Sequence, residues 1–261
     1  MPNTLKMLYN YHTHTFRCNH ANGEEEDYVK RAVLNGIKKM GFSDHVPLEF
    51  PDGTQSFFRI PMCDGKTYCN EIKALAKKYK EKIDITVGFE MEYYPEYFDK
   101  TLKEAKEYGA QYLILGQHYI GPENVSKPTI SKSDSVEELK EYVKTIVAGM
   151  KAGVFSYVAH PDIFNFIGDI KLYQKEMRKI CVASRELNIP LEINFLGIRQ
   201  NRNYPNDAFW KVVGEEQSPV IFGFDSHDVE NAYDNQSLIK AQEMVKKYNL
   251  NYIEDPHLIL L

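Results

Sequence analysis

The chain alternates short apolar runs with longer amphipathic segments along nearly its whole length. The apolar runs are unbroken, as in strands that are buried on both faces of a parallel sheet. Seven of them predict strands, at residues 7–11, 37–43, 83–89, 112–116, 155–159, 190–194 and 220–223. This alternation restricts the fold to the α/β class, with either an open doubly wound sheet or a closed barrel.

The segments between these runs repeat apolar residues every three or four positions, which predicts helices with one buried face. The serine and the acidic first turn of "SDSVEELKEYV" are typical of a helix start. Helices are expected at residues 25–34, 67–79, 97–108, 135–151, 172–187, 207–213 and 231–248. A length of 261 residues is common for one α/β barrel, so we expect a single domain over residues 1–261.

Composition excludes some classes of function. The formal net charge of −5 argues against a general nucleic-acid or membrane-surface binder, whose affinity comes mostly from a basic surface. The four cysteines form no CxxC pair, and we recognise neither a leader nor a membrane span. We therefore expect a cytoplasmic protein with no nucleic-acid or membrane partner. The sequence does not specify an oligomeric state.

Metal-ligating side chains gather where the predicted strands end. They are His12, His14, His45, Glu90, Glu92, His118, His160, Asp225 and His227. The carboxyl ends of parallel barrel strands meet on one face, where active sites lie. Residues two apart on an extended chain point to the same side, so "HTH" and "DSH" can each hold an ion. Imidazole and carboxylate suit zinc, manganese and iron, and the number of ligands predicts more than one ion.

Simpler interpretations apply to single residues. A lone histidine at a strand end is most often a hydrogen-bonded core or loop residue, and HxH alone is a weak motif. The whole constellation is hard to explain as packing. We prefer Glu90 to Glu92 as a ligand because it is nearer the strand, and we expect Cys18 and His257 to be structural.

Seven short motifs in a fixed order resemble the polymerase and histidinol phosphatase (PHP) superfamily. They are "HTHT", "HA" at His20, "GFSDH", "GFEMEY", "GQHYI", "AHPD" and "FDSH". The resemblance implies a distorted seven-stranded (β/α)7 TIM-like barrel with a trinuclear metal site. The three implied ligand groups are His12, His14, Glu90 and Asp225; Glu90, His118 and His160; and His20, His45 and His227.

Two segments, "GFSDHVPLEF" and "LEINFLGIRQNRNYPNDAFW", resemble the histidinol-phosphate phosphatases within that superfamily. This likeness implies that Arg199 contacts the substrate phosphate, which suits a bidentate guanidinium. Relatives often carry basic residues shortly after the "HPD" histidine, whereas this chain has Asn165 and Phe166. Arg17 or Arg202 would then supply the missing contact.

The resemblance implies a metal-dependent phosphomonoesterase that converts L-histidinol phosphate to L-histidinol and phosphate in histidine biosynthesis. Two or three divalent ions of zinc, manganese or iron would hold a bridging hydroxide that attacks phosphorus in line. Glu90, Asp225 and His227 are the expected catalytic residues, and the irregular insert at 47–66 is a candidate lid. Two alternatives stay open: another small phosphate ester, such as a nucleotide or sugar phosphate, as substrate, and a non-catalytic interaction module.

Overall fold

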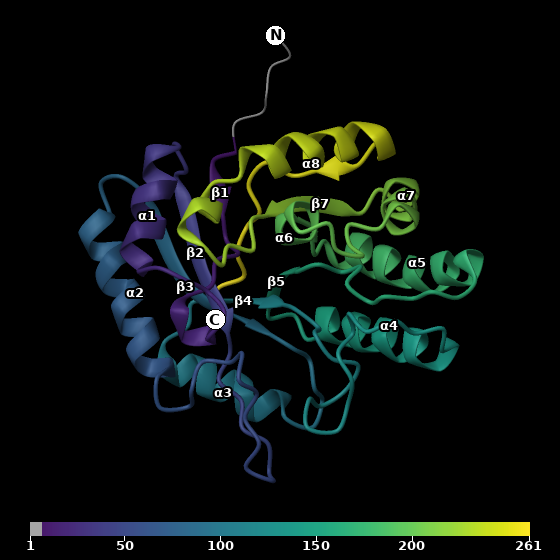
Figure 1. Cartoon of the computed structure of the whole chain (residues 1–261), viewed down its shortest axis with the longest axis horizontal. Helices are drawn as coiled ribbons and strands as arrows, with labels where there is room; N and C mark the ends of the chain where they lie inside the picture. The colour runs from purple at the N-terminus through teal and green to yellow at the C-terminus, as the bar shows by residue number, and fades with distance from the viewer. Residues whose placement is uncertain (1–6) are drawn as a thin grey trace.

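The computed structural model describes residues 7–261, and a curled parallel sheet lies at its centre (Figure 1). Neighbouring strands pair in chain order, and every pairing is parallel. Within the described residues the strands are β1 (Tyr9–Asn10), β2 (Lys39–His45), β3 (Asp84–Met91), β4 (Tyr112–Leu115), β5 (Phe155–Val158), β6 (Leu191–Asn194), β7 (Pro219–Gly223) and β8 (Asn251–Tyr252).

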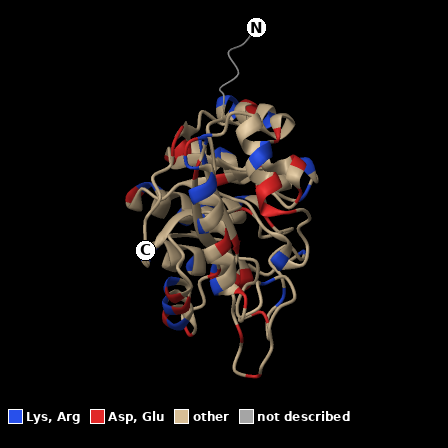
Figure 2. Ribbon diagram, turned by 90° about the vertical axis from the view of Figure 1, so that its left-hand side faces the viewer, with Lys and Arg blue, Asp and Glu red and all other residues tan. Residues whose placement is uncertain are grey.

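Helices surround this sheet in chain order, as Figure 1 shows. They are α1 (Glu25–Leu34), α2 (Gly65–Tyr79), α3 (Phe98–Tyr108), α4 (Val136–Lys151), α5 (Ile170–Leu187), α6 (Phe195–Arg199), α7 (Asp207–Glu216) and α8 (Asn235–Tyr248), with short 3₁₀ turns η1 (Phe16–Cys18) and η2 (Val229–Ala232). Basic and acidic positions are interspersed along the helices in view in Figure 2. No helix between residues 7 and 261 combines the length and the apolar character needed to cross a membrane.

The predicted α/β barrel is confirmed, and its strand number is corrected from seven to eight. The additional strand, β8, is two residues long and pairs with the first two residues of β7. A two-residue strand shows no periodicity, so the apolar pattern could not reveal it. The short helix α6 was also not predicted, because it begins directly where β6 ends.

The ends of the curled sheet meet at the carboxyl edge of the strands. Thr13, just after β1, forms an isolated parallel bridge with Ser226, just after β7. The amide of His14 donates to the Ser226 carbonyl at 2.9 Å, and the Ser226 amide donates to the His12 carbonyl at 3.2 Å. This closure places the "HTH" and "DSH" motifs side by side.

The interior beneath that edge is a packed core. All residues of β4 to β7 are buried, which agrees with the unbroken apolar runs. The fully buried Tyr112 donates its hydroxyl hydrogen to the Tyr11 carbonyl at 2.7 Å, so a polar atom in this core has its partner. The predicted cap of α4 is also present, since Ser135 accepts from the Glu138 amide at 3.2 Å.

Candidate metal centre

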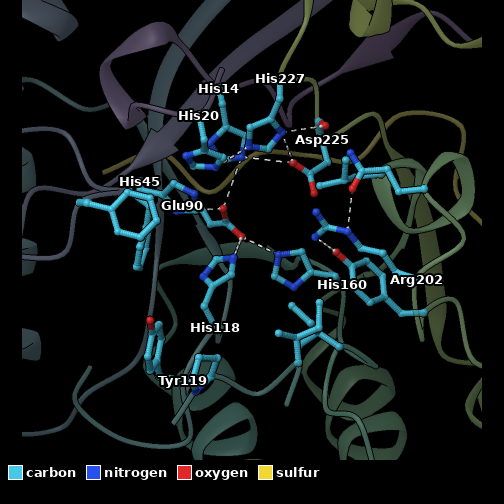
Figure 3. Close-up of a pocket in the computed structure, with 18 of the residues that line it drawn as sticks. His14, His20, His45, Glu90, His118, Tyr119, His160, Arg202, Asp225 and His227 are labelled. Atoms are coloured by element: carbon cyan, nitrogen blue, oxygen red, sulfur yellow. Dashed lines mark hydrogen bonds and ion pairs between the residues drawn. The ribbon is translucent and has the colours of Figure 1, made fainter. Parts of the chain in front are cut away.

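The nine predicted ligands come together at the carboxyl edge of the sheet. Eight of them line one cavity of about 650 Å³ (Figure 3). His12 lies beside them and is fully buried. The elements that carry them are the segments after β1, η1, β4, β5 and β7 and the ends of β2 and β3. The chain thus brings side chains that are more than 200 residues apart in sequence into contact.

Glu90 and Asp225 face the two histidines of the "HTH" motif. The Oε2 atom of Glu90 is 3.5 Å from the Nε2 atoms of both His12 and His14. The Oδ1 atom of Asp225 is 3.7 Å from Nε2 of His12 and 3.3 Å from Nε2 of His14. Two ligands of one tetrahedral ion, with bonds of about 2.1 Å, lie about 3.4 Å apart. These four side chains therefore have the spacing of a metal-ion site.

The second oxygen of Glu90 faces a different pair of histidines. Its Oε1 atom is 2.8 Å from Nε2 of His160 and 3.4 Å from Nε2 of His118. Glu90 therefore joins two groups of potential ligands, one on each oxygen. This arrangement matches the first two groups that the family resemblance implied.

The third group surrounds His227. Its Nε2 atom is 2.9 Å from Nε2 of His20, and its Nδ1 atom is 3.2 Å from Oδ1 of Asp225. Ligand atoms of His14, His45 and His227 lie within 4.8 Å of one another, and so do those of Cys18, His20 and His227. The sulfur of Cys18, expected to be structural, therefore lies beside this group.

Several buried polar atoms of the cluster have no hydrogen-bond partner. They are Oε2 of Glu90, Oδ1 of Asp225, Nδ1 of His45 and Nδ1 of His160. Leaving a buried donor or acceptor unpaired costs about 1–3 kcal/mol, and more for a charged group. A cation between these atoms would satisfy Glu90 and Asp225 together. The donor set and its unpaired atoms fit divalent metal ions.

The pKa shifts of the buried carboxyls and histidines also indicate a site for cations. Burial acts to raise the pKa of the Glu90 and Asp225 carboxyls, but nearby His118 and His12 keep both well below the usual range. Burial acts to lower the pKa of His12, yet Glu192, Asp225 and Glu90 raise it to about 10. Buried carboxylates thus create a strongly negative field at this point, which attracts cations. Burial and the neighbouring His14 lower the pKa of His227 to about 4.

A second layer of buried carboxylates orients three of the histidines. Each accepts a hydrogen bond from an Nδ1 atom, which leaves Nε2 pointing into the cluster, as is common around protein-bound metals. The pairs are Glu192 with His12 at 2.7 Å, Asp44 with His14 at 3.3 Å, and Glu92 with His118 at 2.7 Å. Sequence reasoning missed Glu192 and Asp44. A carboxylate inside an apolar strand, as in "LEIN", was the available signal.

Two glycines make room for the carboxylates. A Cβ atom at Gly116 would lie 1.9 Å from Oε1 of Glu90, and one at Gly223 would lie 1.6 Å from Oε1 of Glu192. Contacts this short do not occur between real atoms. Both positions therefore exclude any side chain while the carboxylates keep these places.

We expect Gly116→Ala to weaken metal binding by at least about tenfold, because its methyl group displaces Glu90. Dialysis against graded chelator followed by elemental analysis measures this change. Gly121→Ala is the control, since its methyl group would meet the movable Ser126 side chain, whose hydroxyl is at 2.8 Å, and no ligand. A Gly116→Ala protein with the metal content of the parent would contradict the tight fit around Glu90.

The three predicted phosphate-binding arginines have different surroundings. Arg202 is exposed, lines the cavity and donates to the Tyr204 hydroxyl at 2.9 Å. Arg17 is buried in ion pairs with Glu25 and Glu71, and it does not line the cavity. Of the two alternatives to Arg199, the structure places only Arg202 against the site.

Arg199 also does not line the cavity. Its guanidinium donates to the carbonyl of Phe224 at 2.7 Å and to the carbonyl of Asp225. Asp225 has a φ of 46°, in the left-handed region that non-glycine residues seldom adopt. Arg199 therefore lies behind Asp225, a candidate ligand, and holds its peptide, while the phosphate contact expected of Arg199 stays a prediction.

The predicted lid at residues 47–66 and a second irregular insert, at residues 119–133, contribute walls to the cavity. The predicted lid supplies Phe57 and Phe58, and the insert at 119–133 supplies Tyr119, Pro128 and Ile130. Phe58 and Tyr119 are stacked with ring centroids 6.1 Å apart. Part of the cavity wall is therefore aromatic and apolar, whereas Arg202, which lies on the other side from Tyr119 in Figure 3, adds a charged group to the lining. Closure of the insert over the site stays a prediction.

Comparisons with known proteins agree with this geometry. The histidinol-phosphatase of Bacillus subtilis is 27% identical over 259 residues, which cover 85% of this chain and 96% of that protein. A solved structure from Listeria monocytogenes has a TM-score of 0.74 at 21% identity and covers 88% of this chain and 98% of its own. The histidinol phosphate phosphatase of Lactococcus lactis, solved with zinc, L-histidinol and phosphate, has a TM-score of 0.70 at 18% identity and covers 94% and 95%.

The family itself is shown by a match over most of the chain. Residues 10–195 match the PHP domain family. That range begins just before the "HTH" motif and contains the carboxylates and histidines of the first two ligand groups except Asp225. The chain belongs to the PHP domain family.

Proposed function

We propose that this protein is a metal-dependent phosphatase that hydrolyses L-histidinol phosphate to L-histidinol and phosphate, working as one PHP barrel domain over residues 1–261. The observation that carries the proposal is the convergence of eight potential ligands on one cavity, with a ninth, His12, buried beside them and unpaired carboxylate oxygens at their centre. The named relatives support the choice of substrate.

Two carboxylates set the spacing of the three proposed ligand groups. Glu90 connects the first group to His118 and His160 through its two oxygens. Asp225 connects His14 to His227 through Oδ1, at 3.3 and 3.2 Å. Two or three ions of zinc, manganese or iron bound there would lower the pKa of water towards neutrality and neutralise charge on the phosphoryl oxygens. Fixing these groups before substrate arrives avoids reorganisation during the reaction.

The remaining cavity residues would bind the rest of the substrate. Arg202 is the cavity-lining arginine among the three candidates, and a guanidinium can hold two phosphoryl oxygens at once. The stacked Phe58 and Tyr119 offer a flat apolar wall of the kind that a heteroaromatic ring packs against. An imidazole-bearing phosphate ester suits both sides of this cavity.

The test is elemental analysis of freshly purified protein beside phosphate release from three substrates. These are L-histidinol phosphate, a nucleoside monophosphate and a sugar phosphate. We expect bound transition metal and a kcat/KM for L-histidinol phosphate at least about 100-fold above the others. A preference for another ester would overturn the substrate, and a metal-loaded protein that turns over no ester would favour the interaction module.

Substitutions of Arg202 and Arg199 should differ in their effects on KM and on metal content. We expect Arg202→Ala to raise KM about tenfold, with metal content unchanged, because it removes a phosphate contact worth about 1.4 kcal/mol. We expect Arg199→Ala to lower metal content, because the Asp225 peptide loses the donors that hold it. Steady-state kinetics and elemental analysis of both proteins measure this. Equal KM effects with full metal content would assign Arg199 to the phosphate instead.

A further inference from the structure

A fully buried arginine lies outside the predicted ligand set. Arg59 belongs to the insert at 47–66 and is 1% exposed. Its Nη1 atom donates to the Val46 carbonyl at 2.9 Å, and its Nη2 atom donates to both Glu92 and Glu123. Its Nε atom faces the two oxygens of Glu123 at 3.1 and 3.2 Å. A buried charge is costly unless it is paired in this way, so these contacts fix the guanidinium.

Glu92 connects Arg59 to His118, a potential metal ligand, and so restrains its ring. One of its oxygens, Oε2, accepts from Arg59, and the other, Oε1, accepts from Nδ1 of His118 at 2.7 Å. The Nε2 atom of His118 then lies 3.4 Å from Oε1 of Glu90. Both Glu92 and Arg59 are buried, and no water needs to bridge these contacts. The orientation of the His118 ring is thus set by a chain of two charged residues.

The same guanidinium joins the two inserts that wall the cavity. Glu123, whose side chain is 2% exposed, accepts from Arg59, from Ser56 and, at 3.4 Å, from the Tyr94 hydroxyl. Phe58 precedes Arg59, stacks on Tyr119 of the other insert and packs edge-on against His45 with centroids 5.0 Å apart. Arg59 therefore holds the wall and the His118 ring in one fixed relation.

We propose that Arg59 and Glu92 are positioning residues that orient His118 for the second ligand group and lock the cavity wall to it. The inference rests on the proposed metal centre and does not depend on the identity of the substrate. This Arg59–Glu92 relay should set the affinity for the ion that His118 contacts. It should leave ion binding by His12 and His14 of the "HTH" motif nearly unaffected. Outer partners of metal-bound histidines typically change metal affinity by about 10–100-fold.

Glu92→Gln is the sharpest variant, because it keeps the size of the side chain. An amide offers one acceptor oxygen and one NH₂ donor, whereas this position needs two acceptors, one for Arg59 and one for His118. Either orientation of the amide therefore puts a donor against a donor. Arg59→Lys is the second variant, since a lysine keeps the charge but cannot span Val46, Glu92 and Glu123 together.

Each full-length protein is equilibrated with Co²⁺ and graded chelator, and the retained ions and the cobalt absorption spectrum are recorded. We expect Glu92→Gln to weaken one class of ion by at least about tenfold and to change its spectrum, and Arg59→Lys to do the same to a smaller extent. Glu176→Gln is the matched control, because Glu176 is a buried glutamate paired with Lys179 on α5. We expect it to retain cobalt as the parent does.

The outcomes separate this inference from the proposed function. If the parent retains cobalt and both relay variants bind it equally well with the parent spectrum, the relay is wrong and the metal centre stands. An equal loss in Glu176→Gln would also overturn the relay, by showing a general effect of removing a buried charge. If the parent binds cobalt but releases no phosphate from L-histidinol phosphate, the proposed function fails and the relay is judged by cobalt retention alone.

Discussion

Glu90→Ala is expected to lower phosphate release from L-histidinol phosphate by at least about 10³-fold. Both oxygens of Glu90 face histidines, so its loss removes a ligand from two groups at once. Metal ions contribute several kcal/mol to stabilising the transition state in such sites, and about 4 kcal/mol corresponds to a factor of 10³. Initial rates of phosphate release, measured beside elemental analysis of the same samples, test this expectation.

The matched control for this variant is Glu176→Ala, which removes a buried glutamate on α5 that does not line the cavity. We expect that protein to keep its metal and its rate, with only lower thermal stability. A Glu90→Ala protein that retains normal metal content and a tenth or more of the parent rate would contradict the bridging position of this carboxylate. Loss of rate with full metal content would show that Glu90 acts in the chemical step and is not needed to hold the ions.

The sequence predicted the placement of the site because strand ends carry most of its ligands. His45 ends β2, Glu90 is near the end of β3, and His118, His160 and Asp225 come within a few residues of β4, β5 and β7. In a parallel barrel the order of strands brings those ends together whatever the packing details are. His20 has no such position, since it follows the 3₁₀ turn η1, and only the family resemblance placed it.

What the sequence could not show was which polar atoms each side chain contacts. Three arginines, Arg17, Arg199 and Arg202, look alike in a sequence. In the structure acidic side chains pair with Arg17, backbone carbonyls accept from Arg199, and Arg202 lines the cavity. The orienting carboxylates Asp44 and Glu192 escaped notice for the same reason. Their importance lies in contacts with His14 and His12, which come from other strands, and a carboxylate inside an apolar strand does not reveal which histidine it meets.

Removal of the metal ions is expected to abolish activity and to lower the melting temperature by roughly 10 °C or more. Without cations, Glu90 and Asp225 stay buried with unpaired oxygens, and the folded state loses the free energy of ion binding. An ion present at about 1,000 times its Kd stabilises the folded state by about 4 kcal/mol. In a chain of this size, each kcal/mol corresponds to about 2–4 °C. Thermal unfolding with and without chelator measures the shift.

Readdition of single metals then identifies the ion that works, because zinc, manganese and iron all accept these ligands. We expect at least one of them to restore both the rate and the melting temperature. In Glu90→Ala the chelator should shift the melting temperature much less, since the first two ligand groups no longer share a carboxylate. A parent protein whose rate and melting temperature both survive thorough chelation, with no metal left by elemental analysis, would show that this cluster of histidines and carboxylates works without ions.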